Sequence, residues 1–81
     1  MHMGRFSTLA LGMEVRGAEG TLVGWVKEVF ASYLLIDRAM KRDVYIPFDA
    51  VQALWHNQIM LAIPAAQVDT MHWPHPPLFS L

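Results

Sequence analysis

The chain of 81 residues contains no cysteine and few charged residues. Without cysteine it has no disulfide, no thiolate zinc site and no thiol nucleophile, and it can fold in a reducing or an oxidising compartment. Six Lys and Arg stand against seven Asp and Glu, for a net charge of −1. The clustered cations that carry nucleic-acid binding are therefore missing, and we expect no nucleic-acid partner.

Long apolar runs are missing as well. The apolar stretch over residues 9–13 is interrupted by Gly12 and followed at once by Glu14 and Arg16. It is too short for the core of a signal peptide and far too short to span a bilayer. We expect no membrane insertion, and a cytoplasmic location.

The chain is instead rich in apolar side chains. Hydrophobic residues make up 54% and charged residues 16%, against roughly 45–50% and about 25% in average soluble domains. A chain of this length has one small core and commonly gains stability from oligomerisation. The composition predicts one domain that exposes apolar side chains and forms a homo-oligomer.

Glycines divide the first part of the chain into short runs typical of β-strands. Residues 17–20 predict a tight turn, because their two glycines can adopt positive φ angles. Gly24 lies inside the run 21–30 and predicts a bulge that curls the strand. With the side-chain alternation shifted at this bulge, the residues expected to point inward are Val23, Val26 and Val29. Those expected to point outward are Leu22, Trp25 and Lys27.

The remaining pattern completes an all-β fold. Asp49 is expected to cap a helical turn over residues 48–51. Asn57 tolerates a left-handed conformation and predicts, with His56, the last hairpin turn. Pro64 predicts the first residue of a short helix that ends near Met71. The other expected strands are 13–15, 33–36, 44–46, 51–55 and 58–63. The predicted fold is a small barrel of five to six short strands, with a short C-terminal helix and an extended, proline-rich tail.

The order and spacing of these motifs resemble the PRC-barrel family, in particular its short stand-alone members grouped as a domain of unknown function. The match spans about Leu11 to Trp73. It rests on residues 12–15, the turn 17–20, residues 23–26, Tyr33, Tyr45-Ile46-Pro47 with Ala50-Val51, and the closing hairpin.

The resemblance implies a barrel domain over residues 11–73, preceded by an N-terminal segment 1–10 and followed by the proline-rich apolar tail 74–81. Related barrels occur in the H subunit of photosynthetic reaction centres and in a ribosome maturation factor, where they bind proteins. The family has no catalytic motif, so the resemblance implies a non-enzymatic protein-binding or scaffolding module.

Apolar residues at expected surface positions indicate where a partner binds. Members of the family usually have polar residues where this chain has Leu22 and Trp25; the alternative is a different register that buries Trp25. Trp55 either packs across the last hairpin or contacts a partner. The tail 74–81 either docks, on its own barrel or on a second subunit, or is a disordered end. The predicted partner-binding residues are Leu22, Trp25, Trp55, Trp73, Leu78 and Phe79.

A metal site has weaker support from the residue pattern than a protein-binding surface has. His56, His72 and His75 are possible imidazole ligands for zinc or nickel. The prolines around His75 oppose a helix that would bring it onto one face with His72, and no carboxylate lies close by to orient either ring. We expect no metal or other cofactor. A small-ligand or metal-binding barrel is the alternative function.

Catalysis also has little support. No serine has a histidine beside it in the sequence, so an activated nucleophile is not indicated, and we expect no enzyme activity. The charged segment 37–43 predicts a solvated loop with local ion pairs. A charged rim around an apolar docking patch is the alternative for this loop.

Overall fold

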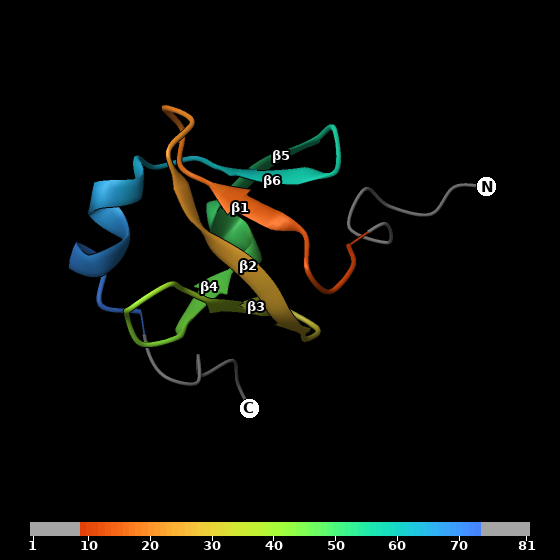
Figure 1. The fold of residues 1–81 in the computed structure, drawn as a ribbon, viewed down its shortest axis with the longest axis horizontal. Helices are drawn as coiled ribbons and strands as arrows, with labels where there is room; N and C mark the ends of the chain where they lie inside the picture. The colour runs from red at the N-terminus through yellow and green to blue at the C-terminus, as the bar shows by residue number, and fades with distance from the viewer. Residues whose placement is uncertain (1–8, 74–81) are drawn as a thin grey trace.

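The computed structural model describes residues 9–73, where six short strands form one sheet in the order β4-β3-β2-β1-β6-β5. Figure 1 shows this sheet curled into a half-barrel, with η2 crossing between its two end strands. The strands are β1 Glu14–Arg16, β2 Leu22–Val29, β3 Tyr33–Asp37, β4 Val44–Pro47, β5 Val51–Trp55 and β6 Gln58–Leu61, and the 3₁₀ helices are η2 Phe48–Ala50 and η3 Ala65–Thr70. The predicted small all-β fold is confirmed. None of the helices in the described part of the chain is long and apolar enough to cross a membrane.

The sheet joins segments that lie far apart in the sequence. β1 pairs antiparallel with β2 and parallel with β6, so the first and last strands are neighbours near the middle of the sheet. β2–β3, β3–β4 and β5–β6 are antiparallel pairs. The one parallel pair brings the turn before β2 close to the chain that leaves β6.

β2 contains two irregularities where the sequence predicts one. Opposite β1, the pairing passes from Gly24 to Leu22, so that Val23 is the extra residue. Opposite β3, it passes from Val26 to Glu28, so that Lys27 is the extra residue. Each shift reverses the face of the side chains that follow. Val26 is buried as expected, and Val23 is half-buried and packs against the core. Val29 is 37% exposed, and its predicted inward orientation is wrong because of the second shift.

The core lies on the concave side of the sheet. Strand residues alternate between buried and half-buried positions, as in Tyr33–Asp37, because successive side chains point to opposite faces. No polar or charged residue is buried in the described part of the chain. The buried hydrophobic residues of the described chain are Val15, Val26, Leu34, Ile36, Val44, Ile46, Val51, Ile59, Leu61 and Val68.

Two turns test the predicted left-handed positions. His56 and Asn57 have φ angles of 50° and 65°, so the predicted turn between β5 and β6 is confirmed. In the turn before β2, Gly20 has a φ of 99° but Gly17 does not have a positive φ. A side chain at Gly17 would instead collide with the backbone nitrogen of Ala65. Only one of the two glycines is therefore required by its φ angle.

The short helices differ in detail from the prediction. Asp49 lies within η2 and does not cap it, because Pro47 is the N-cap and makes no side-chain hydrogen bond. Pro64 precedes η3 with an extended ψ of 153° and is not its first helical residue. The strand predicted to reach residue 63 ends at Leu61. The predicted extended tail lies outside the described residues.

Candidate interaction groove

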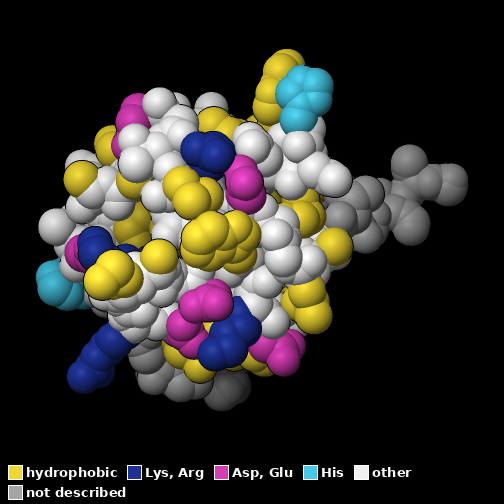
Figure 2. Space-filling view, in the orientation of Figure 1, with side chains coloured by type: hydrophobic (Ala, Val, Ile, Leu, Met, Phe, Trp, Pro, Cys, Tyr) yellow, Lys and Arg dark blue, Asp and Glu magenta, His cyan; other side chains and the backbone are white. Residues whose placement is uncertain are grey.

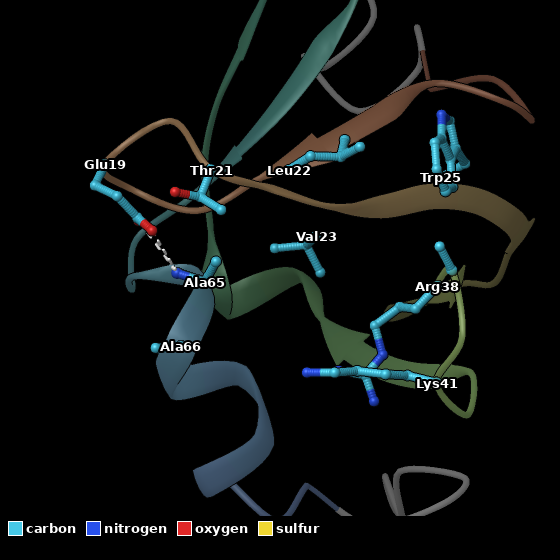
Figure 3. Close-up of a pocket in the computed structure, with 10 residues that line it drawn as sticks. Glu19, Thr21, Leu22, Val23, Trp25, Arg38, Lys41, Ala65 and Ala66 are labelled. Atoms are coloured by element: carbon cyan, nitrogen blue, oxygen red, sulfur yellow. Dashed lines mark hydrogen bonds between the residues drawn. The ribbon is translucent and has the colours of Figure 1, made fainter.

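A hollow of about 470 Å³ lies beside β2 and η3, and we name it the β2 groove. Three segments surround its floor: the turn before β2, the loop between β3 and β4, and the start of η3. Figure 3 shows the side chains of these segments around the hollow. Its lining residues are Glu19, Thr21, Leu22, Val23, Trp25, Arg38, Ala39, Lys41, Ala65 and Ala66.

The floor of the β2 groove is apolar and comes from one stretch of β2. Leu22 is 38% exposed. Trp25, whose backbone pairs with β1 on one side and β3 on the other, is half-buried. In a regular strand Leu22 and Val23 would point to opposite faces. Because Val23 is the bulged residue, both side chains line the same groove. The predicted outward position of Leu22 holds, whereas Trp25 is neither fully exposed nor buried in the core.

One wall of the groove is acidic. The two carboxylate oxygens of Glu19 accept the backbone N–H of Ala65 at 3.1 and 3.3 Å, which ties the turn before β2 to η3. Hydrogen bonds from the backbone N–H of Glu19 itself, then from the Thr21 hydroxyl and the Ala65 N–H, lower the pKa of Glu19 below its ordinary value of 4.5. Glu19 is therefore negatively charged at neutral pH.

The opposite wall is basic. Arg38 Nη1 lies 2.7 Å from Asp69 Oδ1, and Lys41 Nζ lies 2.9 Å from Asp69 Oδ2. Hydrogen bonds from Arg38 and then from Lys41 lower the pKa of Asp69. Two cations share one carboxylate, so this wall carries a net charge of +1 (two positive, one negative).

The ion pairs of the β3–β4 loop correct the predicted local pairing. Arg38 and Lys41 bind Asp69, which is about thirty residues further along the chain, and not the aspartates at the ends of the loop. Asp43 accepts Lys27 Nζ of β2 at 2.8 Å. The loop is thereby fixed to η3 at one point and to β2 at another.

The other predicted partner-binding residues lie away from the β2 groove. Trp55 is 61% exposed at the end of β5, where its ring meets that of His56 edge to face at 4.4 Å. Trp73 is half-buried against the core and lines a separate hollow. Leu78 and Phe79 lie outside the described residues. The structure thus brings together Leu22 and Trp25 but neither of the other two tryptophans.

The histidines do not form a site with one another within residues 9–73. His56 and His72 line two different hollows. In this part of the chain no group of three or more His, Asp or Glu side chains is placed to hold a metal ion. His75 lies outside the described residues.

Sequence reasoning missed two features of the surface. The charged walls of the groove were not predicted, because Glu19, Arg38 and Lys41 come from segments that only the tertiary fold brings together. An aromatic cluster also joins β3 to β4: Phe30 stacks on Tyr33 at 4.6 Å, and Tyr33 meets Tyr45 edge to face at 5.5 Å. The signal for it was present, since both tyrosines alternate with core residues.

Fold and surface together define a small all-β domain with a curled sheet and an apolar groove between walls of opposite charge. Comparison with known protein families finds no family model that matches the chain, and comparison with curated proteins finds no similar sequence. The resemblance to the PRC-barrel family is therefore a prediction that rests on the motifs alone.

Proposed function

We propose that this protein is a non-enzymatic, PRC-barrel-like binding module that acts in the cytoplasm by protein contact and that associates with itself. The observation that carries the proposal is the apolar floor of the β2 groove, where Leu22, Val23 and Trp25 line an open hollow. Apolar side chains that line an open surface hollow are typical of interaction sites, and tryptophan is enriched among the residues that dominate binding energy.

The surrounding surface supports the same proposal. Figure 2 shows apolar side chains in the middle of this face, with acidic and basic side chains around them. An apolar centre with a charged rim is the common anatomy of a protein interface. Large exposed apolar residues in the described part of the chain are Leu11, Leu22, Val29, Phe30, Met40, Trp55 and Met71.

A small ligand is the second candidate occupant of the groove, because its volume of about 470 Å³ falls within the range of ligand pockets. Charged side chains line this volume as well, and each of them also binds within the protein. Glu19 binds Ala65, and both cations bind Asp69. Native mass spectrometry of freshly purified protein separates the two functions, since a retained ligand adds its mass to the monomer.

The substitution Trp25→Glu tests self-association. It places a carboxylate on the floor of the groove, where burial against a second apolar surface would penalise the charge. We expect a lower oligomer mass than in the wild type, measured by light scattering after size exclusion over a concentration series. Circular dichroism on heating checks that unfolding stays cooperative.

Leu22→Gln provides a second, milder variant of the floor, because Leu22 is more exposed and its replacement is less able to disturb folding. Leu11→Glu is the matched control, since Leu11 is 65% exposed and lies outside the groove. An unchanged mass in both floor variants would remove the groove from the interface. A monomeric wild type at all concentrations would overturn self-association itself.

A further inference from the structure

The β2 groove has charges of opposite sign on its two sides. Figure 3 shows Glu19 at one side of the hollow and Arg38 and Lys41 at the other, with Val23 between them. The acidic side carries one negative charge, and the basic side carries a net charge of +1 after pairing with Asp69. A partner of one sign would be attracted by one wall and repelled by the other. The groove therefore favours a partner that is itself acidic on one side and basic on the other.

A second copy of the same chain is such a partner. In a two-fold symmetric dimer both copies use the same surface, and a residue on one side of the axis faces the residue on the other side in its partner. An axis that runs along the groove, between its two walls, would set each acidic wall opposite a basic wall. A groove with opposite charges on its two walls is thus complementary to a second copy of itself. A groove with charges of a single sign would repel a second copy.

We infer that the β2 groove is the interface of a two-fold symmetric dimer in which Glu19 of each copy faces Lys41 of the other. This inference rests on the proposed self-association and adds its geometry. The axis runs along the groove above Leu22 and Val23, so that the two apolar floors face each other. Each dimer then contains the Glu19–Lys41 contact twice.

The groups on both walls are able to make these contacts without losing their present partners. The Lys41 side chain is 58% exposed and has three donor hydrogens, of which the contact with Asp69 needs one. The carboxylate of Glu19 has about four acceptor positions, and its three donors are the N–H groups of Ala65 and of Glu19 itself and the Thr21 hydroxyl, which leaves room for one more. The contact across the dimer therefore adds partners to both walls and displaces none.

Charge reversal tests this arrangement. Glu19→Lys makes both walls positive, and Lys41→Glu makes both walls negative, so each single variant repels its own copy at two symmetric contacts. We expect each of them to raise the dimer dissociation constant at least tenfold, measured by sedimentation equilibrium at low salt. An equimolar mixture of the two variants combines a positive groove with a negative one, and we expect it to form a heterodimer at least as tight as the wild-type dimer. The double variant should recover the wild-type constant within about threefold.

Lys27→Glu is the matched control, because Lys27 pairs with Asp43 outside the groove, and its reversal should leave the dissociation constant unchanged. Cooperative unfolding of each variant, followed by circular dichroism, shows that a loss of dimer is not a loss of fold. A wild-type dimer that is insensitive to both reversals, with no heterodimer in the mixture, would overturn the inferred geometry and leave self-association in place. A monomeric wild type would overturn both.

Discussion

Gly24 shows how a single residue sets the spacing between two strands. A Cβ atom at this position would collide with the carbonyl oxygen of Asp37 and would lie 2.9 Å from Cγ2 of Ile36. The backbone of β2 therefore approaches β3 at a point where only glycine fits. The requirement differs from that at Gly20, where no atom is near and the φ of 99° is what demands glycine.

The substitution Gly24→Ala should destabilise the domain by about 1–3 kcal/mol, the range for extra methyl groups forced into a packed site. Urea denaturation measures the free energy of unfolding. Ala62→Val is the control, because it enlarges an exposed side chain and should change stability by less than about 0.5 kcal/mol. A Gly24→Ala variant as stable as this control would mean that β2 and β3 separate easily at this point.

At the scale of the element, η3 completes the core of the half-barrel. Its one buried side chain, Val68, is 3% exposed and joins the core formed by the strands. Asp69, the next residue, binds two cations of the β3–β4 loop, Arg38 and Lys41. Glu19 binds the first residue of η3 from the opposite side. The helix is thereby fixed to the turn before β2 and to the β3–β4 loop, which are the two charged walls of the groove.

The substitution Val68→Ala should lower the free energy of unfolding by about 2 kcal/mol, because each buried methylene contributes about 0.8 kcal/mol and the cavity left behind adds to the loss. The neighbouring substitution Gln67→Ala is the matched control on the exposed side of η3 and should have almost no effect. Chemical denaturation of both variants measures the difference. Equal stability of the two would show that η3 adds nothing to the core.

For the whole molecule, three charged side chains with shifted pKa values, Glu19, Asp69 and Lys27, connect stability to pH. The pKa values of Glu19 and Asp69 are lowered from their ordinary 4.5 and 3.8. Their stabilising effect is present above these ordinary values and is lost as the pH falls through the lower pKa values of the folded state. The hydrogen bond and charge of Asp43 raise the pKa of Lys27 above 10.5, so its contribution is present below 10.5 and is lost as the pH rises through the higher folded value.

The thermal midpoint of unfolding should therefore fall as the pH decreases below about 4, through the lowered pKa values of Glu19 and Asp69. Asp69→Asn isolates one part of this effect. The difference in midpoint between wild type and Asp69→Asn should be largest at neutral pH and should narrow in acid, because protonated Asp69 is also neutral. A difference that stays constant down to pH 2 would contradict the assignment of this pH dependence to Asp69.

The sequence predicted most of the elements because they depend on short-range patterns. Alternation of apolar residues located the strands, and the left-handed preference of Asn57 located the last turn. The predicted inward orientation of the Val29 side chain was wrong, because the face on which it lies depends on the second irregularity, at Lys27. No glycine or proline marks that irregularity in the sequence, and it arises from the pairing of β2 with β3.

Of the β2 groove, only residues of the apolar floor were predicted from the sequence. Leu22 and Trp25 are three residues apart on one strand, so their outward orientation could be predicted without a structure. Glu19, Arg38 and Asp69 are separated by tens of residues, and the sequence contains no signal that they meet at η3. Trp55 was grouped with the other apolar candidates, although it lies outside the groove.

By itself the sequence determined that this chain forms short strands, has no cysteine chemistry and has more apolar side chains than one small core can bury. These properties follow from composition and from contacts between near neighbours in the chain. Only the tertiary structure decided which apolar residues lie together and which charges flank them. Pairing of β1 with β6 brings η3 beside β2, and long-range contacts of this kind depend on packing that no local pattern encodes.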